Sequence, residues 1–330
     1  MSSDRLDLRA RLLRAFLLSP GRARSGQALA SESGLSPAQV EEAVSSLRKI
    51  GFPLEAAEEG RWRLALPLPD LLSAEELLAR ANEGGARIAW SPVVHDRVES
   101  TNDILLRQEA AGAPEGLVVA ANRQSRGRGR LGRRWESDST GGIYASLLLR
   151  PALRFPQVHR LTILTTLAAV EAVEEVAGFS LKIKWPNDLM GSRGKLGGIL
   201  TEVAAEGGRV RGGVIGIGLN VAQEPESFSE EIRSRASSLW IEMGHRFRRV
   251  EILAAILRRI AARYQGDFAE IRRLWEWRCE SLGKIVRVRQ GEKILEGHAL
   301  GLDEDGLLLL RTESGAVVPL LAGELLGAGR

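Results

Sequence analysis

The chain has 330 residues, more than a single hydrophobic core usually organises, so two or three domains are expected. No apolar run approaches the roughly 18 residues of a transmembrane helix, and charged residues interrupt the start of the chain, so a cytoplasmic location is expected. The single cysteine, Cys279, excludes an internal disulfide, and the scattered histidines argue against structural zinc and Cys-His catalysis. A net charge of +4, with far more arginine than lysine, favours local anion contacts over a general coating of nucleic acid.

The first 66 residues predict a small helical unit followed by a hairpin. Apolar spacing, cap residues and glycine stops predict helices at residues 6–17, 25–33 and 36–50. The segment 56–66 is typical of a β-hairpin. Helix, turn, helix and hairpin together predict a winged helix-turn-helix domain over residues 1–66, followed by the stiff linker Pro67-Leu-Pro69.

Residues 73–278 alternate between predicted strands and predicted helices, which indicates an α+β domain with a mixed sheet and helices packed on it. Strands are expected at 93–98, 117–121, 143–149, 181–185, 199–204 and 210–217. Helices are expected at 100–112, 157–177 and 249–277, the last broken near Gly266. Short strands separated by Gly and Asp then predict a small β-barrel over residues 279–330.

The densest chemical signal is the Arg/Gly loop Gln124-Ser-Arg-Gly-Arg-Gly-Arg-Leu-Gly-Arg-Arg-Trp135. Its glycines match the dinucleotide pattern G-x-G-x-x-G, but no helical periodicity follows, and no kinase signature follows either. Glycines let backbone N–H groups approach an anion, and guanidinium groups offer paired donors, so the loop is suited to phosphate or carboxylate groups. A solvated basic loop, or an RNA-contacting segment, explains the loop alone equally well.

Two further segments carry polar groups at predicted strand ends. In Lys182-Ile-Lys-Trp-Pro-Asn-Asp188 an amide could position a nucleotide and a carboxylate could hold Mg²⁺, although Pro-Asn-Asp is also an ordinary turn. The segment Lys195-Leu-Gly-Gly198 is not a Walker A motif, because that motif requires glycine where Leu189 stands. Lys195 is still suited to the oxygen of an acyl phosphate, with a surface lysine at a hairpin as the alternative.

Two weaker motifs complete the set. Glu99-Ser-Thr-Asn102 places hydroxyl and amide groups at a helix N-terminus, where they would suit a small polar head group or act simply as a helix cap. Gly216-Ile-Gly-Leu-Asn220 at a strand end would receive a flat ligand or form a tight turn.

Taken in order, these five motifs resemble those of the biotin protein ligase family. With the predicted helix-turn-helix and the C-terminal β-module, the resemblance covers nearly the whole chain. The chain resembles the bifunctional type of the family, which also represses the biotin operon. It implies an SH3-like form for the C-terminal β-barrel. A lipoate-type acyl ligase is the related alternative, which the joint presence of the Arg/Gly loop and K-W-P-N-D disfavours. A purely regulatory transcription factor that senses a small anion is the alternative from another class.

The resemblance implies a role for each matching residue. The implied biotin-binding residues are Ser100, Thr101, Asn102, Gln124, Gly127, Arg128, Gly129, Arg130, Lys195 and Gly198, of which Ser100, Thr101 and Gln124 would bind the ureido ring. The implied ATP or adenylate residues are Arg128, Arg130, Trp135, Lys184, Asn187 and Asn220. Arg130 and Lys195 would be catalytic, bracketing the carboxylate and the α-phosphate, and Asp188 would bind Mg²⁺. Arg133 and Arg134 are expected to be surface charge.

The resemblance also implies partners. Biotin and ATP would form biotinyl-5′-AMP, and a lysine of the biotin carboxyl carrier protein of acetyl-CoA carboxylase would then accept biotin. Such chemistry needs no enzyme nucleophile, in agreement with the absence of a Cys-His or Ser-His pattern. Biotin, as biotinyl-5′-AMP, would be the co-repressor on operator DNA, with no membrane partner and with a homodimer left open.

One departure concerns DNA. The predicted recognition helix and wing carry four carboxylates that would face phosphates: Glu41, Glu42, Glu58 and Glu59. The residues that would favour DNA are Gln39, Ser45, Arg48, Lys49, Arg61 and Arg63. The resemblance therefore favours operator binding, while the charge of this surface argues against it.

Overall fold

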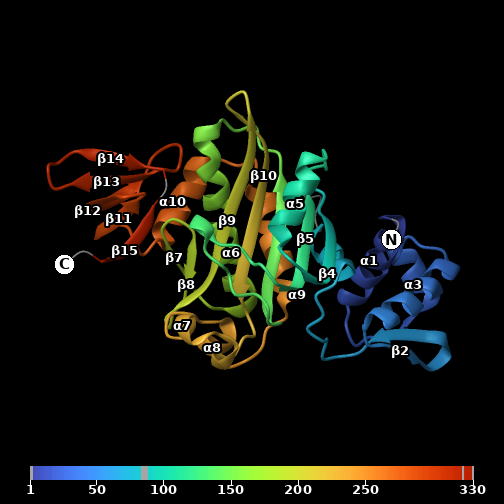
Figure 1. The fold of residues 1–330 in the computed structure, drawn as a ribbon. Helices are drawn as coiled ribbons and strands as arrows, with labels where there is room; N and C mark the ends of the chain where they lie inside the picture. Colours follow the sequence, from blue (N-terminus) through green and yellow to red (C-terminus); the bar gives the residue numbers. More distant parts are fainter. Residues whose placement is uncertain (1–2, 83–87, 322, 329–330) are drawn as a thin grey trace.

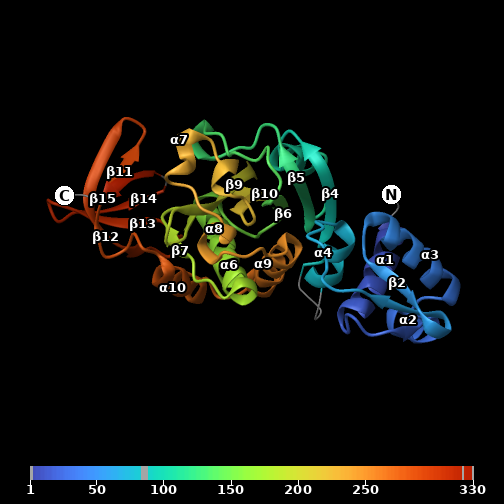
Figure 2. The same cartoon turned by 90° about the horizontal axis from the view of Figure 1, so that it is seen from below.

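The structure is a computed structural model that describes residues 3–82, 88–321 and 323–328. Its strands form three sheets, of three, seven and five strands, that follow one another along the chain. Figures 1 and 2 show an N-terminal helical region and a C-terminal sheet at opposite ends of a larger central region. The predicted α+β fold is confirmed.

The N-terminal region packs its helices around their own core of buried apolar side chains, and a small sheet lies beside them. Its elements are α1 (Ser3–Leu17), β1 (Arg24–Ser25), α2 (Gly26–Ser33), α3 (Pro37–Ile50), β2 (Leu54–Ala57), η1 (Glu58–Gly60) and β3 (Arg61–Leu64). Ser36 and Gln39 form a capping box at the start of α3, and Gly34 ends α2 with a φ of 64°. The three predicted helices are thus confirmed, and the order of elements is that of a winged helix-turn-helix.

The central sheet has the strand order β4-β5-β6-β10-β9-β8-β7, in which β4 and β5 are parallel and the other neighbours are antiparallel. Its strands are β4 (Ser91–Val98), β5 (Leu117–Gln124), β6 (Gly142–Leu149), β7 (Lys182–Lys184), β8 (Asp188–Met190), β9 (Lys195–Glu206) and β10 (Arg209–Asn220). The region's longer helices are α4 (Ala74–Ala81), α5 (Thr101–Ala110), α6 (His159–Ala177), α9 (Arg249–Arg263) and α10 (Phe268–Arg278).

The two faces of the central sheet are covered differently. Buried side chains of α6 and α9 join those of the strands in the main core. On the opposite face α5 covers part of the sheet through a small cluster around Leu105 and Val214. The remainder of this second face is left for the site described below, because β9 and β10 carry glycines there instead of core side chains.

Three features of the central region differ from the sequence-based expectations. The segment Gly216–Asn220 is the end of strand β10, not a tight turn. Strand β8 was not predicted, because a three-residue strand after Pro186 has no readable periodicity. Between β10 and α9 lie three short elements that were also not predicted: η4 (Pro225–Ser227), α7 (Glu230–Arg233) and α8 (Leu239–Met243).

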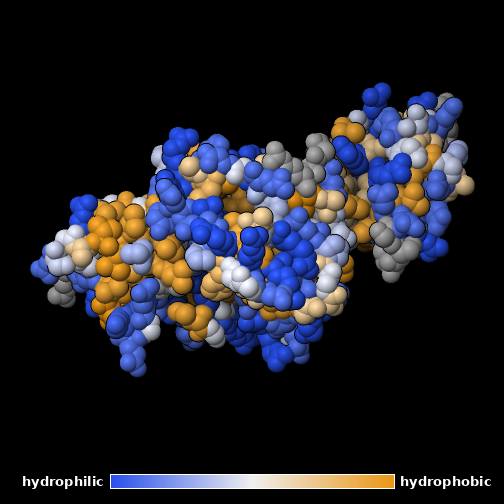
Figure 3. Space-filling view, turned by 90° about the horizontal axis from the view of Figure 1, so that it is seen from above, coloured by the Kyte–Doolittle hydropathy of each residue, from blue (hydrophilic) through white to orange (hydrophobic). Residues whose placement is uncertain are grey.

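The C-terminal region is an antiparallel sheet of order β14-β13-β12-β11-β15. Its strands are β11 (Ile285–Gln290), β12 (Lys293–Leu302), β13 (Leu308–Thr312), β14 (Val317–Leu320) and β15 (Glu324–Ala328). It exposes several apolar side chains, and apolar residues gather over this end of the molecule in Figure 3. Among the residues that the structure describes, no helix is long and apolar enough to cross a membrane.

Candidate functional site

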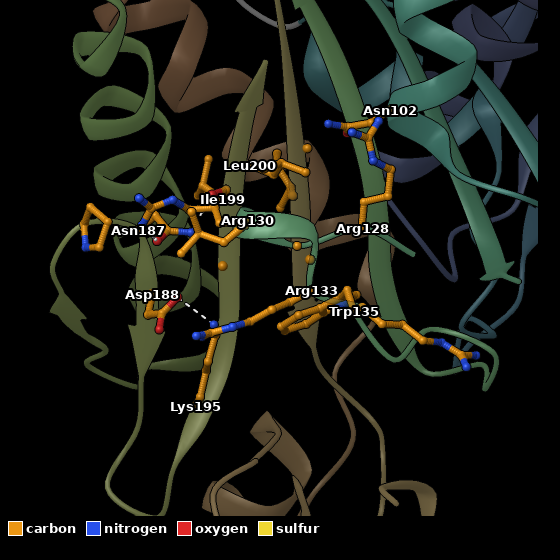
Figure 4. A pocket seen from close by; sticks show the side chains of 18 of the residues that line it. Asn102, Arg128, Arg130, Arg133, Trp135, Asn187, Asp188, Lys195, Ile199 and Leu200 are labelled. Atoms are coloured by element: carbon orange, nitrogen blue, oxygen red, sulfur yellow. Dashed lines mark hydrogen bonds and ion pairs between the residues drawn. The ribbon is translucent and has the colours of Figure 1, made fainter. Parts of the chain in front are cut away.

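A pocket of about 220 Å³ lies on the α5 face of the central sheet, between the Arg/Gly loop and the ends of several strands. Its lining includes most of the residues singled out from the sequence: Ser100, Thr101, Asn102, Gln124, Arg128, Gly129, Arg130, Trp135, Lys184, Asn187, Asp188, Lys195 and Gly198. Asn102 and Arg128 lie at one end, and Asp188 and Lys195 lie at the other (Figure 4). Folding therefore brings together motifs from five separate segments of the chain.

Glycines in β10 make room for the side chains that shape this pocket. A Cβ atom at Gly216 would lie 2.3 Å from Asn102 Oδ1, and a Cβ atom at Gly218 would lie 2.7 Å from a ring carbon of Trp135. Since any larger residue would displace these side chains, the G-I-G pattern is explained by close packing beneath the site.

Neutral hydrogen-bonding groups gather at the α5 end. The hydroxyl of Ser100 caps α5 by accepting from the backbone N–H of Asp103. The backbone N–H of Thr101 donates to Gln124 Oε1 at 2.8 Å, and Gln124 Nε2 donates to the hydroxyl of Ser137 at 3.2 Å. These groups are buried, so their orientations are fixed before a ligand arrives.

Arg128 crosses the same end of the pocket from the Arg/Gly loop. Its guanidinium donates to Asp103 Oδ1 at 2.6 Å and to Glu202 Oε1 at 2.8 Å. Burial opposes the charge, but the hydrogen bonds and charges of these two carboxylates outweigh it and hold the pKa of Arg128 above its ordinary value. The loop is thereby tied to α5 and to β9.

Arg130 enters the pocket farther along. Its guanidinium donates to Asn187 Oδ1 at 3.0 Å and to the backbone carbonyl of Gly323 at 3.4 Å. Burial lowers the pKa of Arg130, and the nearby charge of Asp188 only partly offsets that effect. Asn187 in turn donates to the carbonyl of Ile199, which fixes its amide.

At the far end, Lys195 Nζ lies 2.6 Å from Asp188 Oδ1 and 5.6 Å from the centre of the Trp135 ring. Both charged side chains are partly exposed to the pocket. Trp135 Nε1 is buried and has no hydrogen-bond partner. The Nε1 side of the ring packs against Gly218, so the groups that surround the space for an anionic ligand are the Lys195 ammonium, the Asp188 carboxylate and the Trp135 ring.

The C-terminal region completes the pocket, which the sequence did not predict. Gly323, Glu324 and Leu325 line it, and the Glu324 carboxylate pairs with Arg133 of the Arg/Gly loop. This hydrogen bond, with the charges of Arg133 and Arg289, holds the pKa of Glu324 below its ordinary value. Arg133 is thus part of a bridge between regions as well as surface charge.

Two residues of the predicted site lie elsewhere. Gly127 is outside the lining, and a Cβ atom there would lie 2.3 Å from Ser137 Oγ, so its place is a close packing position behind the loop. Asn220 is buried and donates to the carbonyl of Ser237 at 3.0 Å, which turns its amide toward the segment before α8. The contact between Asn220 and Ser237 was not predicted, because no element was predicted between β10 and α9.

Both chain segments that line the pocket match models of known protein families. The model of the Biotin/lipoate A/B protein ligase family matches residues 94–220, and that of the Biotin protein ligase C terminal domain matches residues 281–325. The chain is 36% identical over 315 residues to the bifunctional ligase/repressor BirA of Bacillus subtilis, covering 94% of this chain and 96% of that protein. It is 28% identical over 313 residues to BirA of Escherichia coli K12, covering 94% of each.

A solved structure of a biotin protein ligase has a similar fold. The biotin protein ligase from Aquifex aeolicus, in complex with biotin and ATP, matches with a TM-score of 0.60 and 32% identity, covering 71% of this chain and 97% of that chain. The two matched family segments contain the whole pocket lining, from Ser100 to Leu325. The chain therefore belongs to the family of bifunctional biotin ligase/repressors, and it is a biotin protein ligase.

Proposed function

We propose that this pocket binds biotin at its α5 end and ATP at its Asp188 end, forms biotinyl-5′-AMP, and passes the biotinyl group to a lysine of the biotin carboxyl carrier protein of acetyl-CoA carboxylase. The observation that carries the proposal is the arrangement of one pocket, with buried neutral hydrogen-bonding groups at the α5 end, Lys195 beside Asp188 at the other end, and Arg130 between them. A neutral ureido ring fits the first end, and phosphates fit the second.

In this assignment Ser100, Thr101, Asn102 and Gln124 face the ureido ring, and Arg128 and Gly129 close over it. Arg130 and Lys195 bracket the biotin carboxylate and the α-phosphate. The nucleotide is bound by Lys184, Asn187 and Trp135. Gly127 and Asn220 support the site from behind, where they pack against Ser137 and bond Ser237.

The chemistry consists of two group transfers. An oxygen of the biotin carboxylate attacks the α-phosphorus of ATP, the bond to the bridging oxygen breaks, and pyrophosphate leaves. The uncharged amine of the carrier lysine then attacks the acyl carbon, AMP leaves and the amine loses a proton. Negative charge grows on the phosphate oxygens in the first step, and Arg130 and Lys195 are the cations placed to stabilise it.

Asp188 is the residue that would bind Mg²⁺. Within the described part of the chain no cluster of three or more His, Cys, Asp or Glu side chains could hold a metal by itself. The single carboxylate Asp188, set among cations, fits a Mg²⁺ ion held mainly by the phosphates of ATP. When bound, that ion would neutralise phosphate charge, while Lys195 would have to release Asp188.

A biotin-dependent exchange of labelled pyrophosphate into ATP tests the proposal. The purified protein should catalyse exchange with biotin and should not do so with lipoate or octanoate. Exchange driven by lipoate or octanoate would assign the chain to the lipoate-type reaction instead. No exchange with any of these acids, together with tight biotin-dependent binding of DNA, would support a purely regulatory protein.

A second activity is supported by the N-terminal region. We propose that α3 and the β2–β3 wing bind operator DNA when biotinyl-5′-AMP occupies the pocket. Arg48 and Lys49 of α3 and Arg63 of β3 are exposed. The carboxylate of Glu41 accepts a hydrogen bond from Trp62 Nε1 at 3.2 Å, which ties it to the wing but leaves its negative charge in place. A gel shift with and without biotin and ATP, repeated with Arg48→Ala, tests it: loss of the shift in the variant is the expected result.

We also propose domain boundaries at residues 1–66, 73–278 and 279–330, supported by the separate core of the N-terminal region and by the separate C-terminal sheet. Because the reaction consumes ATP, a cytoplasmic location is proposed as well. A homodimer stays a prediction that sedimentation with and without biotin would test.

A further inference from the structure

Glu202 of β9 is a carboxylate outside the pocket lining that bonds two lining residues, and the scheme above does not use it. Its two oxygens have different partners: Oε2 accepts from Asn102 Nδ2 at 2.9 Å, and Oε1 accepts from Arg128 Nη2 at 2.8 Å. Figure 4 shows Arg128 extending toward Asn102 at this end of the pocket. One side chain thus contacts both the wall of the pocket and the loop that crosses it.

The contact with Asn102 fixes the orientation of an amide. A carboxylate only accepts hydrogen bonds, so Glu202 requires the Asn102 nitrogen on its side. The Asn102 oxygen then faces the hydroxyl of Ser146, which lies 2.5 Å away and donates to it. The same hydroxyl lies 2.7 Å from Thr101 Oγ1, so the chain of hydrogen bonds continues into the groups assigned to the ureido ring.

The contact with Arg128 fixes the loop. Asp103 holds the other guanidinium nitrogen at 2.6 Å, so two carboxylates from two elements hold one arginine. The side chains are only partly exposed, at 41% for Arg128, 28% for Asp103 and 24% for Glu202. A single ion pair at such exposure contributes little to stability, but here one guanidinium is held by two carboxylates, and such a network contributes more than an isolated surface pair.

We propose that Glu202 is a positioning residue for biotin, which orients Asn102 and at the same time anchors Arg128 as a strap across the bound ring. This inference rests on the proposed placement of biotin at the α5 end. Glu202 makes no bond to the reacting atoms in this scheme. Its effect is on how long biotin stays bound, and the ATP end of the pocket lies outside its reach.

The two contacts can be separated by substitution. In Glu202→Gln the side-chain oxygen can still accept from Asn102, while the amide nitrogen faces Arg128 and loses that bond. In Glu202→Ala both contacts are lost. Glu206→Gln is the matched control, because it neutralises an exposed carboxylate at the end of the same strand.

The experiment measures biotin dissociation by chase, the KM for biotin and for ATP in pyrophosphate exchange, and the melting temperature without ligand. We expect Glu202→Gln to release biotin about 5- to 30-fold faster, the effect of losing one charge-assisted hydrogen bond. Glu202→Ala should release it faster still. The KM for ATP at saturating biotin, the melting temperature and all values for Glu206→Gln should stay close to those of the unchanged protein.

Two results would overturn the assignment. Biotin dissociation from Glu202→Gln within twofold of the unchanged protein would show that the anchor has no effect on biotin. A parallel change in both KM values and in the melting temperature would make Glu202 an ordinary structural residue. Failure of the unchanged protein to bind biotin is a distinct result, because it would contradict the proposed function itself.

Discussion

Substitution of Lys195 distinguishes a catalytic role from a structural one, because the two roles predict very different effects on rate and on stability. The ammonium group of Lys195 lies 2.6 Å from Asp188 Oδ1, but the side chains are 35% and 25% exposed. A pair so accessible to solvent contributes about 0–1 kcal/mol to stability. If the same ammonium group stabilises charge on the α-phosphate, its removal costs about 3–4 kcal/mol in the transition state, or roughly 100- to 1,000-fold in rate.

Lys195→Ala should therefore depress biotin-dependent pyrophosphate exchange at least about 100-fold while the free energy of unfolding in urea falls by less than about 1 kcal/mol. Lys195→Met separates charge from packing, because it keeps an aliphatic stem against Trp135 and should be as inactive as the alanine variant. Lys182→Ala, on exposed β7 surface, is the matched control. Exchange reduced less than threefold, or a loss of stability that accounts for the lost activity, would refute the catalytic assignment.

Three further predictions follow from other contacts. Arg130→Gly should still form adenylate but release it, so that lysines of bystander proteins become labelled on a streptavidin blot; retention equal to that of the unchanged protein would contradict the role. Arg9→Ala leaves the buried carboxylate of Glu75, 5% exposed, without its 2.9 Å partner and should cost about 3–5 kcal/mol in urea unfolding; a cost below about 1 kcal/mol would contradict it. Glu324 has a lowered pKa, so its contact is complete above the ordinary pKa of glutamate and is lost as the pH falls through the lowered value. Glu324→Gln should therefore lower the melting temperature at pH 7, and the difference should shrink as the pH falls below the ordinary range of glutamate; a difference independent of pH would refute this.

Local signals allowed much of the fold to be predicted from the sequence. The two ends of α3 were predicted from Ser36 and Gly51, which cap the helix. Helix caps can be read from the sequence because their geometry depends on residues close to each other in the chain. The same holds for the long strands of the central sheet, where apolar runs are bounded by turns. The three-residue strand β8 and the short helices α7 and α8 were not predicted. An element of three to five residues has too few positions to show a period.

The candidate site was predicted as a set of motifs but not as a set of contacts. The pairing of Arg133 with Glu324 joins residues 191 positions apart and depends on how the C-terminal sheet docks, which no local pattern encodes. The family resemblance implied a nucleotide role for Asn220, yet its amide bonds the carbonyl of Ser237. Glu202 was missed because a single carboxylate in an amphipathic strand has the pattern of a surface residue.

The transfer reaction itself tests the central claim most directly. The protein is incubated with biotin, ATP, Mg²⁺ and a biotin carboxyl carrier domain, and the carrier is analysed by intact mass spectrometry beside a variant whose acceptor lysine is arginine. The account predicts one added biotinyl group on the carrier, none on the arginine variant, and none when ATP is omitted. An unmodified carrier, with a protein that is folded and binds biotin, would contradict it.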